Sequence, residues 1–317
     1  MPMGVRHRDD RAAMKAGDTL TDDACSRQSL EAAEPLAGSA PQASAWLVLE
    51  EPGPWGKDAL RGSPIPDSVA DWAEALRADH GVRTIAARHP SRRRLGPGEP
   101  RHVWLATTHP GRQQLRHVLV DRLEEVLEWD RSLFAGANMP LIGEPADGSI
   151  EFICTHSGRD ACCAVLGRQE VNRTPGAWEC SHLGGHRFAA TSLVLPDGNC
   201  FGRLGPNSAR DTAHLRGATH LPADLQVAEI AVRKQEGLDP SAPLWTSPTP
   251  MDVVASQDTD ERVSTADVHD GLAGHWRVHC EQQTISAPAS CHTLPTERTI
   301  WRAVRVQAVQ EESTHGR

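Results

Sequence analysis

The sequence has 317 residues, a net charge of −9, and 38% hydrophobic against 24% charged residues. This balance indicates a globular protein that can bury a sizeable core and divide into two or three units, and no apolar run approaches the roughly 20 residues that span a bilayer. The acidic net charge argues against nucleic acid as a partner. The polar N-terminus lacks the apolar core of a secretory signal, so we expect a cytoplasmic protein that does not enter the membrane.

The eight cysteines occur without a predicted secretory signal, which favours reduced thiols or metal ligands over a disulfide framework. Residues 1–43 are polar and rich in Ala, Asp and Ser, so we expect a disordered tail there. Cys25 falls in this tail and is predicted to be an exposed thiol with no special role.

Residues 45–130 are patterned for strands and helices, with Val69, Ala73 and Leu76 at helical spacing. The predicted elements are a strand at 45–51, a helix at 67–80, strands at 82–88 and 101–108, and a short strand that leads into a helix within 116–130. Trp55, in the loop PGPWG between the first strand and the first helix, is expected to pack against the protein rather than bind a ligand.

Two cysteines flank a predicted strand–loop–helix unit in the middle of the chain. The run SIEFIC (149–154) reads as a strand that ends at Cys154, followed by the loop THSGRD. Asp160 is a predicted helix N-cap, which places Cys162 and Cys163 in the first helical turn. The unpaired N–H groups of that turn favour a thiolate at Cys163. The segment RTPG (173–176) is expected to end the helix.

Two histidines follow in WECSHLGGHRF, where His182 and His186 enclose a Gly-Gly pair that lets the backbone approach a ligand closely. Two thiols and two imidazoles are the ligand types of a soft-metal or iron–sulfur site. A structural Cys₂His₂ zinc site is an alternative, although the eight-residue spacer between Cys154 and Cys163 exceeds zinc-finger spacing. Thiol–disulfide chemistry is a further alternative, although the chain contains no C-x-x-C motif.

Four neighbours of this motif are predicted to play lesser parts. Cys162 is expected to be buried, because it faces roughly 100° away from Cys163 on a helix. Cys180 is expected to pack in the core. His156 and Arg159, in the loop, are candidate hydrogen-bond donors to sulfur.

The remainder of the chain predicts a hairpin, two helices and a β-rich end. TSLVL and NCFGRL are strands joined by the turn PDG. SARDTAHL (208–215) is predicted to begin a helix capped by Asn207 or Ser208, and PADLQVAEIAVRKQEG forms another, ended by Gly237. A proline-rich linker leads to the runs DVVAS, RVSTADV, HWRVHCEQQ and IWRAVRVQAV, read as three or four antiparallel strands, and to the tail EESTHGR, which we expect to be disordered.

The motifs CTHSGRDACC, WECSHLGGHRFA and LPDGNCFGRL resemble those of the sucrase/ferredoxin-like proteins, a branch of the thioredoxin-like [2Fe–2S] ferredoxins. The resemblance extends from about Cys25 to Gly237. It implies that a [2Fe–2S] cluster is held by Cys154, Cys163, His182 and His186.

We therefore expect an α/β (α+β) fold in which a thioredoxin-like ferredoxin domain is preceded by a second thioredoxin-like half and followed by a small antiparallel β appendage. The expected divisions are a tail at 1–43, the N-terminal half at 44–144, the ferredoxin domain at 145–237 and the appendage at 238–317. The N-terminal half would be a decayed repeat that lacks metal ligands. No Ser-His-Asp, P-loop or GxGxxG signature is present, so we expect a non-enzymatic electron carrier or redox sensor that works with a redox partner protein.

The implied imidazole ligands predict a redox potential that depends on pH. If His182 and His186 each bind iron through one nitrogen and keep an N–H near solvent, reduction raises their pKa and takes up a proton. The midpoint potential should then fall as the pH rises from neutral into the alkaline range. A redox titration followed by visible absorbance at several pH values measures this, and a potential independent of pH would contradict it.

Overall fold

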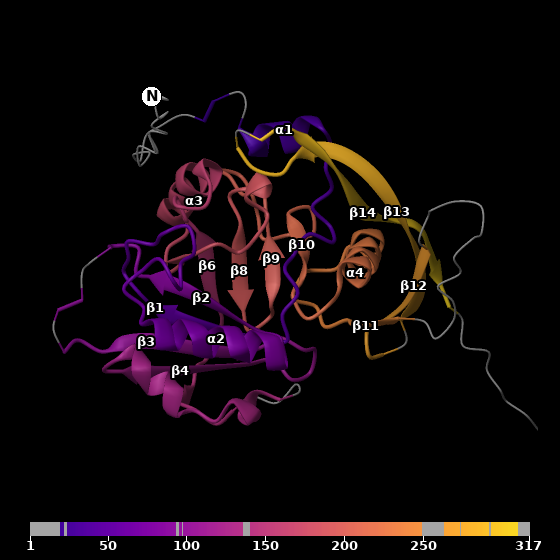
Figure 1. Ribbon diagram of the computed structural model, residues 1–317. Helices are drawn as coiled ribbons and strands as arrows, with labels where there is room; N and C mark the ends of the chain where they lie inside the picture. The colour runs from indigo at the N-terminus through magenta and orange to yellow at the C-terminus, as the bar shows by residue number, and fades with distance from the viewer. Residues whose placement is uncertain are drawn as a thin grey trace, which may run out of the picture.

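The computed structural model describes residues 20–21, 24–92, 95–96, 98–135, 140–248, 263–272, 274–291 and 293–309. Within these residues ten strands form one mixed sheet and four form a second, antiparallel sheet, with helices packed around them (Figure 1). No helix in the described ranges combines the length and apolar character needed to cross a membrane. The predicted α/β (α+β) class is confirmed.

The N-terminal half is a βαβ unit followed by a hairpin. Its elements are β1 (Ala45–Glu50), α2 (Asp67–His80), β2 (Val82–Arg88), β3 (Arg101–Thr107) and β4 (Gln114–Val120). β1 pairs in parallel with β2 and antiparallel with β3, and β3 pairs antiparallel with β4. All six residues of β1 are buried because this strand is central, and α2 covers the sheet with Val69, Ala73 and Leu76.

The C-terminal half repeats the same pairing. Its elements are β6 (Ile150–Cys154), α3 (Ala161–Arg173), β7 (Trp178–Cys180), β8 (Ser192–Leu195), β9 (Asn199–Phe201) and β10 (Leu215–Ala218). β6 is parallel to β7 and antiparallel to β8, and β8 is antiparallel to β9. Both halves therefore have the strand order of a thioredoxin-like unit, and the predicted second half, at the N-terminal side, is present and contains no cysteine.

The two halves meet where β2 pairs antiparallel with β7, with Ala87 opposite Cys180 and Arg88 opposite Glu179. This pairing makes one continuous sheet of both halves. Glu179 is almost fully buried, and its carboxylate accepts hydrogen bonds from Arg88 Nη2 at 2.8 Å and Arg92 Nε at 2.7 Å. Burial tends to raise the pKa of Glu179, but the hydrogen bond from Arg92 and the charge of Arg88 outweigh it, and the pKa is lowered.

Two predicted helices differ from the structure. After β4 the chain forms only short 3₁₀ turns, η1 (Leu123–Glu128) and η2 (Arg131–Phe134), before β5 (Glu144–Pro145) pairs with β4. The predicted helix at 208–215 is wrong, because this segment consists of turns that lead into β10. Its side chains bond elsewhere: Arg210 pairs with Glu151 at 2.8 Å and Glu170 at 2.9 Å. These ion pairs hold the segment against β6 and α3 in a conformation that is not helical.

The prediction of a disordered tail is wrong for residues 24–43, and residues 1–19 lie outside the described ranges. α1 (Cys25–Glu31) begins at a fully buried Cys25, which contradicts the predicted exposed thiol. Glu34 lies just after α1, and its carboxylate forms an ion pair with Arg187 at 2.6 Å. Its backbone carbonyl accepts a hydrogen bond from Arg203 Nη2 at 2.7 Å. These two arginines therefore hold the N-terminal segment against the C-terminal half.

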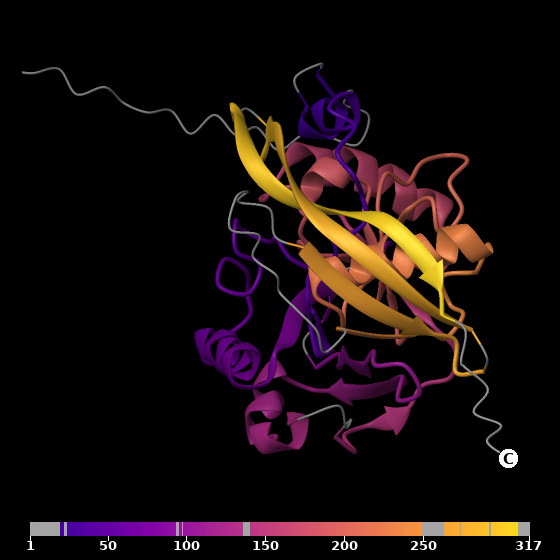
Figure 2. The ribbon, with the colours of Figure 1, turned by 90° about the vertical axis from the view of Figure 1, so that its right-hand side faces the viewer.

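The predicted β appendage is confirmed as a four-stranded antiparallel sheet that packs on α4 (Ala223–Glu236). Its strands are β11 (Trp245–Pro248), β12 (Val263–His269), β13 (His275–Pro288) and β14 (Pro295–Ala308). The long β13–β14 hairpin arches over α4 and reaches α1 (Figures 1 and 2). α4 ends at Gly237 as predicted. The predicted strand DVVAS and the tail EESTHGR lie outside the described residues.

We predict that Glu179→Gln weakens the junction between the halves. Removing one partner of a buried ion pair leaves the arginine charges uncompensated, at a cost of about 3–5 kcal/mol in the free energy of unfolding at neutral pH. Because the pKa of Glu179 is lowered in the folded chain, its contribution is present above the ordinary carboxyl pKa and is lost as the pH falls through the folded-state pKa. Chemical denaturation of the variant and the wild type should therefore give stabilities that converge on acidification.

The matched control is Glu74→Gln, which removes an exposed partner of Arg61 and should cost less than about 1 kcal/mol. Equal losses in the two variants, or a difference from wild type that does not change with pH, would contradict the prediction.

Candidate metal centre

The strand β6 and the helix α3 place two thiols side by side. Cys154 is the last residue of β6 and Cys163 lies in the first turn of α3, and both are almost fully buried. Asp160 is the N-cap as predicted, with its Oδ1 accepting a hydrogen bond from the Cys162 N–H at 2.9 Å. α3 ends at Arg173, where the RTPG motif predicted it.

His182 joins these thiols from the loop that follows β7. Its Nδ1 lies 4.0 Å from Cys154 Sγ, and the ligand atoms of Cys154, Cys163 and His182 all lie within 4.8 Å of one another. The Cys163 thiol donates a hydrogen bond that lowers the pKa of Cys154 well below its ordinary value, and His182 lowers it further. The same hydrogen bond raises the pKa of Cys163 well above its ordinary value, so the group favours a thiolate at Cys154, and the predicted thiolate at Cys163 is wrong. The group contains the donor types of a soft-metal site.

His186 stands beside this group without entering it. Its ring stacks on His182 with centroids 5.3 Å apart, and its Nε2 lies 2.5 Å from the carbonyl oxygen of Ala289 in the C-terminal hairpin. A carbonyl can only accept, so Nε2 carries the proton and Nδ1 keeps a lone pair. Among the described residues Nδ1 is buried and has no hydrogen-bond partner. A metal-ligating histidine has this arrangement, with one ring nitrogen free and the other donating to a carbonyl.

Arg216 is a buried charged residue near the Cys/His group that the sequence analysis did not single out. It is buried within β10, and its guanidinium donates to the carbonyl of Gly184 at 3.1 Å and to the hydroxyl of Ser39 at 3.1 Å. Burial lowers the pKa of Arg216, whereas charge on Cys200, Cys154 and Cys163 raises it. A cation therefore lies beneath the SHLGGH loop. An arginine inside an otherwise apolar strand, LRGA, is the only sequence signal for it.

Gly185 is required for this packing. It adopts a left-handed φ of +69°, and an added Cβ would collide with the guanidinium of Arg216. The Gly-Gly pair thus lets the histidine loop lie directly on the buried arginine, which differs from the predicted approach to a ligand.

The PGPWG loop of the N-terminal half covers the cysteine loop. His156 Nε2 lies 2.6 Å from the Gly56 carbonyl, and the rings of Trp55 and His156 meet edge to face with centroids 5.9 Å apart. Trp55 is buried, so the predicted packing role is confirmed. His156 is buried, and its ring Nε2 donates to the Gly56 carbonyl. Its backbone N–H hydrogen-bonds to the Cys154 thiol and helps to lower the pKa of Cys154, so the predicted hydrogen bond from His156 to sulfur comes from the backbone and not from the ring.

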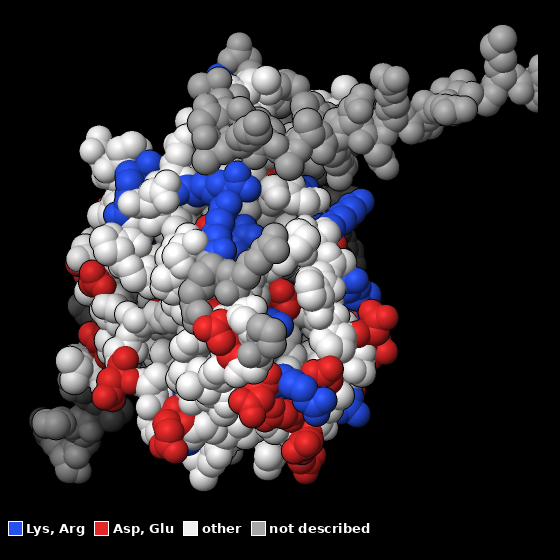
Figure 3. Space-filling model, turned by 90° about the vertical axis from the view of Figure 1, so that its left-hand side faces the viewer, with Lys and Arg blue, Asp and Glu red and all other residues white. Residues whose placement is uncertain are grey.

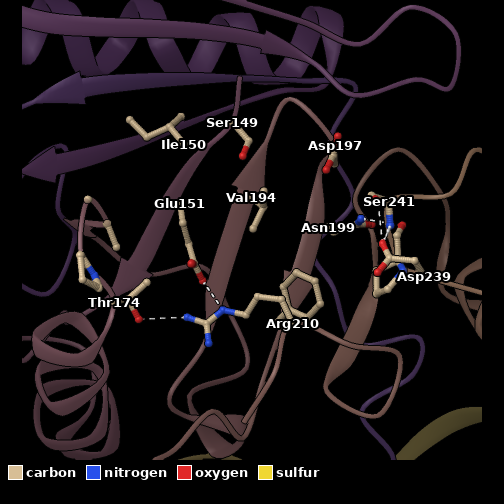
Figure 4. A pocket seen from close by; sticks show the side chains of 15 residues that line it. Ser149, Ile150, Glu151, Thr174, Val194, Asp197, Asn199, Arg210, Asp239 and Ser241 are labelled. Carbon is tan, nitrogen blue, oxygen red and sulfur yellow. Dashed lines mark hydrogen bonds and ion pairs between the residues drawn. The ribbon is translucent and has the colours of Figure 1, made fainter. Parts of the chain in front are cut away.

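Two cavities lie near these elements. One, of about 440 Å³, opens beside His182 and is lined also by His156, Arg159 and Lys57. The other, of about 420 Å³, lies at the opposite end of β6 (Figure 4). Two of its charged groups are paired, Arg210 with Glu151, as Figure 4 shows. The first cavity gives solvent a route to His182 of the Cys/His group.

Fold and site together define an α/β protein built from two thioredoxin-like halves, one of which contains a buried Cys/His group. A family model described as sucrase/ferredoxin-like matches residues 36–215, more than half of the 317 residues. The chain belongs to the sucrase/ferredoxin-like family. No curated protein and no solved structure matches the chain.

We predict that Gly167→Ala disturbs the thiol pair. An added methyl would overlap the carbonyl oxygen of Cys154, so α3 must move away from β6 and carry Cys163 with it. Alanine by itself favours a helix over glycine by about 0.5–1 kcal/mol, so a net loss in the free energy of unfolding, measured by urea denaturation, would report the clash.

Gly205→Ala is the matched control, because no atom lies within 4 Å of the added methyl there. A Gly167 variant as stable as the wild type would show that α3 and β6 do not need this close approach.

Proposed function

We propose that the protein binds a [2Fe–2S] cluster through Cys154, Cys163, His182 and His186 and serves as an electron carrier or redox sensor. The observation that supports this most directly is the convergence of Cys154, Cys163 and His182 with the unpartnered Nδ1 of His186 beside them. These donors come from the end of β6, the first turn of α3 and the segment after β7, at the same end of the parallel pair β6 and β7. Membership of the sucrase/ferredoxin-like family supports the same reading.

The donor set fits the charge of such a cluster. Two thiolates balance the oxidised core, whereas four would leave it doubly negative. The Arg216 guanidinium adds positive charge beneath the loop. Such a cluster supplies one-electron exchange, and both features favour a potential above that of plant-type ferredoxins.

The surrounding residues orient the ligands and limit water. The Ala289 carbonyl fixes the ring of His186 and leaves its Nδ1 for the metal. The loop around Trp55 closes one side, whereas His182 borders the open cavity. In this proposal electrons pass through His182 to a redox partner protein. On the face in Figure 3, several Lys and Arg side chains gather in the upper part, whereas the lower part mixes acidic and basic side chains; the basic group can attract an acidic partner.

Two alternatives use the same residues. A structural zinc ion would take the same two thiolates and two imidazoles. Thiol–disulfide exchange would use Cys154 and Cys163, but these are not spaced as C-x-x-C, and all eight cysteines are free thiols in this structure. The long spacer and the family favour the cluster over both. The pH-dependent potential expected from imidazole ligands belongs to this proposal and depends on the same ligand set.

Protein purified without oxygen should contain about two irons and two acid-labile sulfides per chain and should absorb visible light. Cys154→Ser and Cys163→Ser should lose or bleach this absorbance, because each removes a thiolate ligand. Cys162→Ser should keep most of the iron, since Cys162 lies outside the ligand group. The measurements are iron and sulfide analysis with absorbance spectra.

Cys200→Ser is a further control, a buried thiol on β9 outside the ligand group. Stoichiometric zinc bound by Cys154 and Cys163, with no labile sulfide, would favour the zinc alternative. Loss of iron in Cys162→Ser but not in Cys163→Ser would reverse the assignment of the ligand.

A further inference from the structure

Three thiols that the redox site does not use meet at one point beside it. Cys25 opens α1, Cys162 lies in the first turn of α3, and Cys291 lies in the connection between β13 and β14. Their sulfur atoms form a triangle, with Cys25–Cys162 at 3.6 Å, Cys162–Cys291 at 3.4 Å and Cys25–Cys291 at 3.6 Å. The pairs are 137, 129 and 266 residues apart in sequence, so this convergence is a product of the tertiary fold alone.

A carboxylate stands at the fourth corner. Asp160 Oδ1 lies 3.3 Å from Cys291 Sγ and 3.7 Å from Cys25 Sγ, and the ligand atoms of all four residues lie within 4.8 Å of one another. With Zn–S bonds of about 2.3 Å, two thiolates at adjacent corners of a tetrahedron are separated by about 3.8 Å. The three sulfur–sulfur distances are slightly shorter than this value, so zinc binding would require the sulfur atoms to move only slightly apart.

We propose that Cys25, Cys162, Cys291 and Asp160 form a structural Zn²⁺ site, separate from the [2Fe–2S] site. Four protein ligands leave no open position, which is typical of a structural rather than a catalytic zinc site. The site joins three segments: the N-terminal helix, the start of α3 and the C-terminal hairpin. It does not depend on the proposed cluster, because no ligand is shared.

The surroundings of these ligands fit the assignment. The Cys25 N–H points at Cys291 Sγ at 3.5 Å, a hydrogen bond that favours the thiolate. Asp160 Oδ2 accepts from the Cys291 N–H at 3.1 Å and from the Ser290 hydroxyl at 3.2 Å, which orients the carboxylate. Adjacent residues of α3 point roughly 100° apart, so Cys162 serves this site while Cys163 faces the other.

Metal analysis of the full-length wild type should give about one zinc per chain in addition to iron. Cys25→Ser and Cys291→Ser should each lower zinc from about one to near zero while iron and visible absorbance remain. Cys154→Ser should do the reverse, losing iron and keeping zinc. The matched control is Cys280→Ser, a buried thiol on β13 that packs against α4 and should keep both metals.

Zinc that persists in Cys291→Ser would place the metal elsewhere and overturn the proposal. Iron lost together with zinc in that variant would show that the three thiols serve the cluster, which also overturns a separate site. Failure of the cluster proposal looks different, because it removes iron from the wild type. If zinc takes the place of the cluster, the wild type should contain about two zinc ions, and Cys25→Ser and Cys291→Ser should each still remove one of them.

Two measurements on the wild type keep the test decisive if a variant does not fold. Zinc-edge X-ray absorption should give about three sulfurs near 2.3 Å and one oxygen near 2.0–2.2 Å, and a mixture of two sulfurs and two nitrogens would overturn the proposal. Thiol titration of the unfolded, metal-free chain without reductant should count all eight cysteines. A lower count would indicate a disulfide among them and overturn it as well.

Discussion

The structure depends on the antiparallel pairing of two short strands, β2 and β7. Each half could complete only part of a sheet alone, and the pairing of Ala87 with Cys180 and Arg88 with Glu179 joins them. The carboxylate of Glu179 is buried at this junction, where it forms ion pairs with Arg88 and Arg92. An uncompensated charge there would be costly, so the same ion pairs specify that these two strands, rather than others, lie side by side. β7 also pairs with β6, which ends at Cys154, so this junction lies directly beside the Cys/His group.

The repeated topology explains how the N-terminal half contributes to the site in the C-terminal half. The loop after β6 in the C-terminal half lies between the thiols of Cys154 and Cys163, and the corresponding loop after β1 contains Trp55. Because the halves are joined edge to edge, the second loop lies on the first, with the Gly56 carbonyl against His156 and Gly158 closely packed on Gly56. A half without ligands has thus become part of the wall around the site.

Local sequence patterns predicted most of the regular structure, and three of the four predicted ligands, Cys154, Cys163 and His182, lie together in the fold. The helices at 67–80 and 161–173 have periodic apolar faces or clear end signals such as Asp160 and RTPG, and these signals act within a few residues. What they could not predict depends on contacts distant in sequence. Cys25 is buried by Cys291, 266 residues away, and Arg210 keeps 208–215 from forming a helix by pairing with Glu151 and Glu170. None of these three partners can be recognised from the sequence close to the residue that it contacts.

The contact between His186 and Ala289 determines when, during synthesis, the site can be completed. The carbonyl that orients the imidazole lies 103 residues further along the chain. Domains fold from the N-terminus as the ribosome releases them, so both halves of the large sheet can form while this carbonyl is still unsynthesised. The site reaches its final form only when the C-terminal hairpin has been made and has closed over α4 and α1. If the site binds a metal as proposed, loading into the finished geometry follows translation.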